Sequence, residues 1–137
     1  MNVTTPTSAA TIVFGRKLGR RLRAMDVVLL YGDLGAGKTT LTKGIAAGLG
    51  YKGRVVSPTF GLAREYRGKR VSIYHVDLYR IETGKLEGLG LEEIFDDSNA
   101  AVIVEWAERL GGLHLSAAVK VFLSYVDERS RKIEVAA

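Results

Sequence analysis

Apolar residues form two short continuous runs in the chain, at residues 27–31 and 101–104. The first run is rich in β-branched residues and the second is wholly apolar, which is typical of strands buried on both faces. Two further pairs of segments resemble strands, and the members of each pair are joined by a short polar loop, which predicts a hairpin. The predicted hairpins join residues 60–66 to 71–76 and residues 119–126 to 132–135.

A helical period marks the N-terminal segment, where apolar residues recur every four positions. These residues form the predicted buried stripe: Ala10, Phe14, Leu18 and Leu22. Ser8 is the predicted N-cap, and the helix is expected to end near Arg23. A second helix is predicted over residues 38–49, and short helices interrupted by glycines are predicted over residues 78–97.

The order of these elements is strand, helix, hairpin, helix, strand, hairpin. That order favours an α/β fold in which a mixed central sheet is flanked by helices. The chain has 137 residues, of which 47% are apolar and 26% are charged. This length and balance suit one folded core, so we expect a single domain over residues 1–137.

Charge is unevenly placed along the chain, although the formal net charge is only +5. Residues 38–80 hold nine basic and two acidic residues, whereas residues 81–108 hold eight acidic residues and one lysine. Such a separation suits phosphate chemistry, nucleic acid or a charged partner. A solvated mixed surface is the alternative interpretation.

Several classes of site and location are excluded or disfavoured by composition. The chain has no cysteine, which excludes disulfides, iron–sulfur clusters and thiolate zinc sites. The two histidines, His75 and His114, are too few for a histidine metal cage. No apolar run approaches the about 20 residues of a bilayer span, and no targeting segment is recognisable. We therefore expect a cytoplasmic protein that makes no membrane contact.

The segment Gly32-Asp33-Leu34-Gly35-Ala36-Gly37-Lys38-Thr39 matches the phosphate-loop pattern G-x-x-x-x-G-K-[ST]. It follows a predicted buried strand and opens a predicted helix, as this motif requires. Glycines let backbone N–H groups approach phosphate oxygens, and the helix N-terminus favours negative charge. Lys38 is expected to reach the β- and γ-phosphates, and the Thr39 hydroxyl to bind Mg²⁺. The alternative is a glycine turn followed by a capping threonine.

The identity of the bound base depends on a second motif. Guanine-specific proteins of this class carry an Asn-Lys-x-Asp element. The asparagines of this chain are Asn2 and Asn99, and neither begins such an element. ATP is therefore the expected nucleotide.

Two acidic residues follow predicted strands, Asp77 after residues 71–76 and Glu105 after residues 101–104. A carboxylate at a strand end is the usual second anchor of Mg²⁺ in phosphate-loop enzymes. One of the two would belong to the Mg²⁺ shell, while the other would position or activate water. Alternatively, either carboxylate caps a helix or pairs with a nearby arginine.

Three further residues have both a functional and a structural interpretation. Thr59, in the segment Ser57-Pro58-Thr59-Phe60, would offer a hydroxyl to Mg²⁺ or the γ-phosphate, or would cap a strand. Trp106 would stack or gate near the nucleotide, or would belong to the core. His75 is expected to be a packed or hydrogen-bonded strand residue rather than a metal ligand.

Several segments, in one order along the chain, resemble a single family. They are the phosphate loop continued by Thr40-Leu41, then Ser57-Pro58-Thr59-Phe60 with Glu65-Tyr66, His75-Val76-Asp77-Leu78-Tyr79-Arg80, Gly88-Leu89-Gly90-Leu91-Glu92-Glu93 and Glu105-Trp106-Ala107-Glu108. This set is similar to the TsaE (YjeE) family, the bacterial ATPases of tRNA threonylcarbamoyladenosine synthesis. The resemblance covers about residues 10–125.

The resemblance implies a single α/β domain with a mixed sheet that binds ATP weakly on its own. Members join the TsaD–TsaB pair, and their ATP hydrolysis supports multiple turnovers of the modification of adenosine 37 in tRNAs that read ANN codons. They do not themselves transfer the threonylcarbamoyl group. We expect partner-dependent hydrolysis, contact with tRNA through the complex, and a monomeric free protein.

The resemblance also implies roles for individual residues. Lys38 matches the phosphate-binding lysine, Thr39 and Glu105 match the Mg²⁺-linked residues, and Asp77 matches an aspartate needed for hydrolysis. The remaining matches to the nucleotide site are the loop residues Gly32 to Gly37, Thr40, the switch threonine Thr59, and Trp106.

Two other functions remain open from the sequence. A small-molecule kinase shares the phosphate loop but usually needs an arginine-bearing lid, and residues 81–108 contain no arginine. A non-catalytic module, in which ATP only gates partner binding, would share the same motifs.

Overall fold

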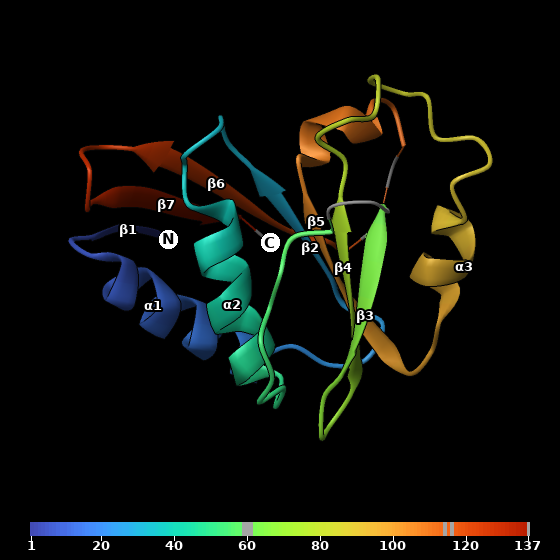
Figure 1. Cartoon of the computed structure of the whole chain (residues 1–137), viewed down its shortest axis with the longest axis horizontal. Helices are drawn as coiled ribbons and strands as arrows, with labels where there is room; N and C mark the ends of the chain where they lie inside the picture. Colours follow the sequence, from blue (N-terminus) through green and yellow to red (C-terminus); the bar gives the residue numbers. More distant parts are fainter. Residues whose placement is uncertain (59–61, 114, 116, 137) are drawn as a thin grey trace.

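The computed structural model describes residues 1–58, 62–113, 115 and 117–136 (Figure 1). Within these ranges the strands form one seven-stranded sheet in the order β1-β7-β6-β2-β5-β4-β3. The strands are β1 (Asn2–Thr5), β2 (Val27–Tyr31), β3 (Ala63–Arg67), β4 (Ser72–Asp77), β5 (Ala100–Glu105), β6 (Val119–Tyr125) and β7 (Arg131–Ala136). The helices are α1 (Ser8–Arg20), α2 (Lys38–Gly48), α3 (Leu91–Asp96) and the 3₁₀-helix η1 (Ala107–Leu110).

The middle of the sheet is parallel and its edges are antiparallel. β2 pairs in parallel with β5 on one side and β6 on the other, and β5 pairs in parallel with β4. The β3–β4, β6–β7 and β1–β7 pairs are antiparallel. The expected mixed α/β sheet is therefore confirmed, and both expected hairpins are present.

Helices cover both faces of this sheet, as Figure 1 shows for α1 and α2 on one side and α3 on the other. Val28 and Leu30 of β2 pack with the residues of α2, whereas Val27 and Leu29 pack with Leu91 and the 3₁₀ segment on the opposite face. The apolar run of β2 thus serves two cores at once, which is why it lacks alternation. None of the helices in the described part of the chain is long and apolar enough to cross a membrane.

α1 and α2 approach each other through glycines. A methyl group at Gly15 would lie 2.7 Å from the carbonyl oxygen of Leu41, and one at Gly44 would collide with the carbonyl oxygen of Ile12. A methyl group at Gly19 would likewise collide with the backbone of α2. This contact fixes the position of α2, whose first residue is the phosphate-loop lysine.

The first helix differs from its prediction. Thr7, not Ser8, is the N-cap, because its side chain accepts a hydrogen bond from the backbone N–H of Ala10 at 3.1 Å. The helix ends at Arg20 rather than near Arg23. Its most buried face is Thr11, Gly15 and Gly19, which a search for large apolar residues overlooks.

The predicted stripe lies beside that face. Leu22 is buried but lies beyond the helix, while Phe14 and Leu18 pack against the core and remain partly exposed. Ala10 is also partly exposed. Small residues take the centre of the contact because the two helix backbones lie too close for larger side chains.

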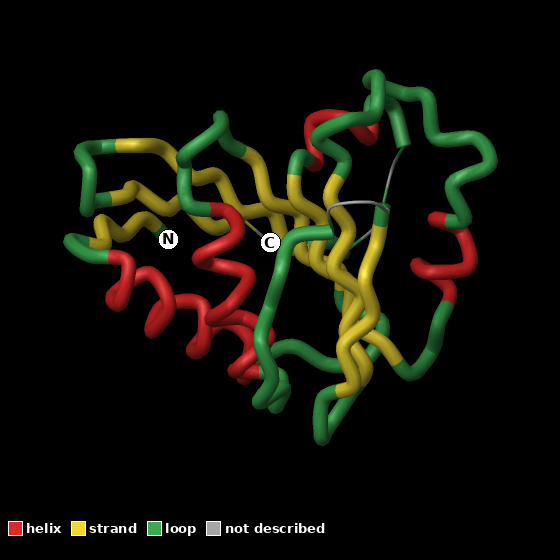
Figure 2. The backbone as a smooth tube through the Cα atoms, in the orientation of Figure 1, coloured by secondary structure: helices red, strands yellow, loops and turns green. Residues whose placement is uncertain are grey.

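Other differences concern short elements. The sequence did not predict β1, which gains its hydrogen bonds from β7, or the 3₁₀-helix after β5. Within residues 78–97, where short helices were predicted, only α3 is helical, and residues 78–90 form turns and loops (Figure 2). Among the described residues β3 begins at Ala63, and the predicted start at residue 60 lies outside the described ranges.

We predict that Gly44→Ala destabilises the protein by about 1–3 kcal/mol, because the new methyl group forces α1 and α2 apart. Helix propensity alone predicts the opposite sign, a gain of about 1 kcal/mol. Thermal and urea unfolding measure the change. Gly112→Ala is the control, since a methyl group there meets nothing within 4 Å in the described structure. Equal stability of Gly44→Ala and the wild type would show that the helix contact is loose.

Candidate active site

The phosphate loop lies between β2 and α2, at the carboxyl end of the parallel strands. Gly35 and Gly37 have φ values of +82° and +98°, which residues with side chains rarely adopt. Gly37 is also the N-cap of α2, so the turn delivers Lys38 and Thr39 to the first turn of the helix. The backbone N–H of Gly32, at the start of the loop, donates to Glu108 at 3.0 Å.

Lys38 is held inside this turn and is only 5% exposed. Its ammonium group donates to the carbonyl oxygens of Gly32 and Asp33, the latter at 2.9 Å, and lies 4.1 Å from the centroid of the Trp106 ring. Burial lowers the pKa of Lys38, while nearby carboxylates, Glu108 first among them, oppose that change. The amine is therefore a desolvated cation at the mouth of the loop.

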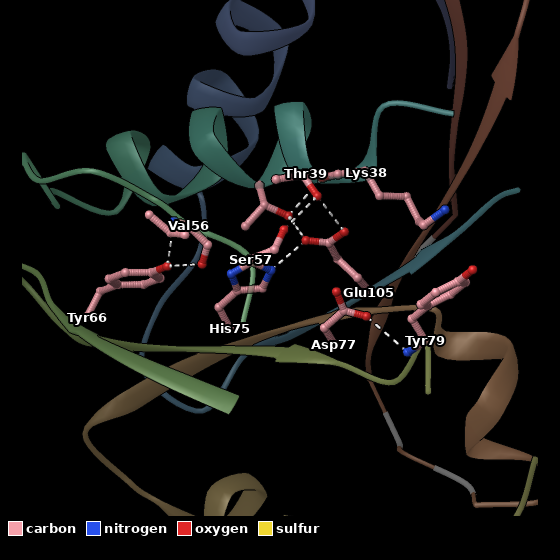
Figure 3. A network of polar contacts seen from close by, with 10 residues as sticks. Lys38, Thr39, Val56, Ser57, Tyr66, His75, Asp77, Tyr79 and Glu105 are labelled. Atoms are coloured by element: carbon pink, nitrogen blue, oxygen red, sulfur yellow. Dashed lines mark hydrogen bonds and ion pairs between the residues drawn. The ribbon is translucent and has the colours of Figure 1, made fainter. Parts of the chain in front are cut away.

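Glu105 is the last residue of β5 and is 2% exposed. Its Oε1 accepts a hydrogen bond from the Thr39 hydroxyl at 2.9 Å, and its Oε2 accepts one from the Thr42 hydroxyl at 3.4 Å. The Nε2 atom of His75 lies 2.5 Å from the same Oε2 (Figure 3). The structure thus brings together Thr39 and Glu105, the two residues assigned to Mg²⁺ from the sequence.

Asp77 ends β4 and lies in register with Glu105, because β4 and β5 are parallel neighbours. Its Oδ1 accepts a hydrogen bond from the backbone N–H of Tyr79 at 3.0 Å. Burial is the main cause that raises the pKa of Asp77, and the Glu105 carboxylate raises it further, against the lowering effect of the Tyr79 N–H. The two acids predicted at strand ends therefore share one end of the sheet.

Trp106 lies at this site and, partly buried, also packs against the core on one face of the sheet. It has a φ of +59°, unusual for a bulky residue, and it is partly exposed. Its ring contacts the Lys38 ammonium group and lies 5.0 Å from the Tyr79 ring. Backbone strain of this kind is found mainly at functional sites. The contacts place Trp106 beside the phosphate loop, consistent with the nucleotide-linked alternative.

A cavity of about 390 Å³ joins these groups. Of the residues proposed from the sequence, those lining it are Leu34, Gly35, Gly37, Lys38, Thr39, Thr40, Asp77, Glu105 and Trp106. Gly32, Asp33 and Ala36 belong to the loop but are not lining residues. Thr59 lies outside the described residues, so its expected role stays a prediction.

Five residues at the site were given no role from the sequence: Thr42, Ser57, Tyr79, Glu108 and Arg131. Of these, Ser57, Tyr79 and Glu108 lie in the segments that carry the family resemblance. Thr42 lies one helical turn after Lys38, so its spacing could have indicated that it faces the same strand. The Ser57 hydroxyl lies 3.3 Å from the Thr39 hydroxyl. Arg131 belongs to β7, far from the loop in sequence, and only the sheet order brings it to the cavity.

The turn before β7 holds Arg131 in place. Its guanidinium donates to the carbonyl oxygens of Asp127 and Ser130 at 2.6 and 2.8 Å and lies 4.9 Å from the Tyr125 ring centroid. The Asp127 carboxylate in turn accepts hydrogen bonds from the backbone N–H groups of Arg129 and Ser130. This turn therefore shapes one rim of the cavity.

The family model described as "Threonylcarbamoyl adenosine biosynthesis protein TsaE" matches residues 5–133 of the chain. The chain belongs to the TsaE family. The match includes every residue of the described site, from the phosphate loop to Arg131.

Curated relatives and a solved structure agree with this assignment. A Nostoc protein named tRNA threonylcarbamoyladenosine biosynthesis protein TsaE is 43% identical over 92% of this chain and 79% of its own length. A Haemophilus influenzae protein of the same name is 37% identical over 96% of this chain and 86% of its own length. The crystal structure of Bacillus subtilis YdiB is similar with a TM-score of 0.77 and 31% identity, covering 97% of this chain and 82% of that one. The recognition of the TsaE family from the sequence is confirmed.

We predict that Asp127→Ala lowers the melting temperature by a few degrees near pH 7 and that the difference shrinks in acid. Backbone donors lower the pKa of Asp127 in the folded protein, so its ionised form stabilises the fold above about pH 4. That contribution is lost as the pH falls through the folded-state pKa. Melting curves from pH 7 to pH 2 test this, with exposed Glu128→Ala as the control. A difference that stays constant into strong acid would contradict it.

Proposed function

We propose that this TsaE-family chain acts in tRNA threonylcarbamoyladenosine biosynthesis as the subunit that binds and hydrolyses ATP with Mg²⁺. The observation that carries the proposal is the contact between the Thr39 hydroxyl and the Glu105 carboxylate, 2.9 Å apart beside the buried Lys38. These are the residue types and positions at which phosphate-loop enzymes hold a metal and a phosphate chain. The names of the relatives support the pathway.

The donor set fits magnesium. Mg²⁺ prefers oxygen ligands, keeps several waters, and is bound through one or two carboxylates together with substrate phosphates. A hydroxyl oxygen of Thr39 and carboxylate oxygens of Glu105 meet this preference, and Asp77 lies in register beside them. Bound magnesium would neutralise phosphate charge and help to align the leaving group.

The chain's own residues then take distinct roles. Lys38 exchanges its loop carbonyls for phosphate oxygens, which a desolvated ammonium group binds strongly. Asp77 anchors one oxygen on the Tyr79 N–H and leaves the other to orient or deprotonate a water molecule. Trp106 covers Lys38 and excludes solvent from its ammonium group.

The proposal includes partners. The TsaE family assignment supports joint action with TsaD and TsaB homologues, and hydrolysis is expected to depend on them and on tRNA. The acidic residues at 81–108 and the basic residues at 38–80 give the chain segments of opposite charge, which suit docking in such an assembly. We expect the free chain to be a cytoplasmic monomer.

We predict that Lys38→Ala weakens ATP binding by about 10-fold or more, because charge-assisted hydrogen bonds contribute about 1.5–3 kcal/mol. Isothermal titration calorimetry with ATP and Mg²⁺ measures the affinity. Lys43→Ala is the matched control, since Lys43 is an exposed lysine on the same helix. Unchanged affinity in Lys38→Ala would contradict the phosphate-binding role.

We predict that Asp77→Asn and Glu105→Gln lower the rate of ATP hydrolysis at least 10-fold and change ATP affinity much less. Both amides keep one oxygen acceptor, so the hydrogen bonds from Tyr79 and Thr39 can persist and the fold is retained. The assay is steady-state hydrolysis with TsaD, TsaB and tRNA present, with exposed Glu92→Gln as the control.

Each result that contradicts the prediction has a distinct meaning. Normal turnover in both acid variants would remove Asp77 and Glu105 from the mechanism. Wild-type binding of ATP without any partner-stimulated hydrolysis would favour a nucleotide-gated module, and transfer of the γ-phosphate to a metabolite would favour a kinase.

A further inference from the structure

Two buried residues link Glu105 to the segment at residues 56–57, and the proposed hydrolysis assigns neither of them a role. His75 is completely buried on β4 and lies against Glu105 through Nε2. Tyr66 is 5% exposed on β3, the antiparallel neighbour of β4. Their rings lie 6.2 Å apart with an interplanar angle of 30°, so they form a stacked pair inside the sheet–helix core.

Tyr66 holds the backbone of Val56 with both functions of its hydroxyl group. The hydroxyl donates to the Val56 carbonyl oxygen at 2.8 Å and accepts a hydrogen bond from the Val56 N–H at 2.9 Å (Figure 3). Val56 lies outside any helix or strand, and the Tyr66 side chain satisfies both its backbone N–H and its carbonyl oxygen. Ser57, the next residue, lies on the active-site cavity.

These contacts form a closed ring of interacting residues around the site, called the circuit below. From Val56 the chain continues to Ser57, whose hydroxyl lies 3.3 Å from the Thr39 hydroxyl, and Thr39 donates to Glu105. Glu105 contacts His75, and His75 stacks on Tyr66, which returns to Val56. Figure 3 shows these residues converging from α2, β3, β4, β5 and the segment before β3.

The energetics favour a positioning role over packing alone. Among the described residues, the Nδ1 atom of His75 is buried without a hydrogen-bond partner, which is costly for a group whose only gain is apolar contact. Its other nitrogen, however, fixes one oxygen of the Glu105 carboxylate. Buried networks of this kind restrict their members to one geometry.

We propose that His75 and Tyr66 are positioning residues that hold the Glu105 carboxylate and the Val56–Ser57 segment in register across the active site. For catalysis, this inference rests on the proposed Mg²⁺-dependent ATP hydrolysis. Neither residue lines the cavity, so each acts through another: His75 through Glu105, and Tyr66 through Val56 and the His75 ring.

The kinetic test uses Tyr66→Phe, His75→Leu, His75→Gln and the Tyr66→Phe/His75→Leu double variant, assayed with TsaD, TsaB, tRNA, ATP and Mg²⁺. Loss of the tyrosine hydroxyl is expected to lower kcat about 2- to 10-fold with KM for ATP nearly unchanged. His75→Leu is expected to lower kcat about 10-fold or more. His75→Gln, whose amide nitrogen can replace Nε2 as a donor to Glu105, is expected to recover part of that loss.

The matched control is Tyr74→Phe. Tyr74 is also a tyrosine of the β3–β4 hairpin with a hydrogen-bonded hydroxyl, but its partner is Asp97, 3.0 Å away and outside the circuit. Its loss should leave kcat unchanged. If Tyr66→Phe behaves like Tyr74→Phe, or if Gln does no better than Leu at position 75, the positioning role is overturned. A double variant whose losses simply multiply would show two independent structural effects and overturn the coupling.

A second measurement separates this inference from the proposed function. In ¹H–¹⁵N spectra of the free protein, Tyr66→Phe is expected to shift the amide resonances of Thr39 and Glu105 as well as those of Val56 and Ser57, whereas Tyr74→Phe is not. This readout needs neither ATP nor folding-sensitive substitutions at His75. Shifts without any hydrolysis by the wild type would uphold the coupling and reject the ATPase; hydrolysis without shifts at Thr39 and Glu105 would do the reverse.

Discussion

The carboxylate of Glu105 is the constraint on which the site depends. A buried charge is costly unless partners surround it, and the fold supplies the hydroxyl groups of Thr39 and Thr42 and the imidazole of His75. These partners come from α2 and β4, while Glu105 itself ends β5. Satisfying one carboxylate therefore fixes the first turn of the phosphate-loop helix against the middle of the sheet.

The same burial acts on the neighbouring charges. It lowers the pKa of Lys38 and raises that of Asp77, so the charged form of each is disfavoured by its surroundings. Groups with shifted pKa values that share one cavity are candidates for a functional site. The close glycine contact between α1 and α2 supports this arrangement from behind, because it keeps α2 from moving away from the carboxylates.

Most of the fold could be predicted from the sequence because strong local signals coincide with tertiary demands. The run at residues 27–31 is apolar on both faces because β2 is a central strand whose two faces pack into separate cores. The burial of Gly15 and Gly19 could not be predicted, since a glycine face carries no hydrophobic signal. β1 was also missed, because its polar residues are held by pairing with β7 at the opposite end of the chain.

In the candidate site, too, local signals revealed some residues, whereas tertiary contacts alone determine which of them are neighbours. Lys38 and Thr39 are identifiable because their motif is local, and Asp77 and Glu105 because each stands at the end of a strand. Which strands are neighbours, however, depends on sheet order and register, and the parallel pairing of β4 with β5 is what places Asp77 beside Glu105. The same register pairs His75 with Ile103, two residues before Glu105 on β5. From that position the His75 ring reaches the Glu105 carboxylate on the neighbouring strand. His75 is thus the packed and hydrogen-bonded strand residue expected from the sequence, and the strand pairing makes Glu105 its partner.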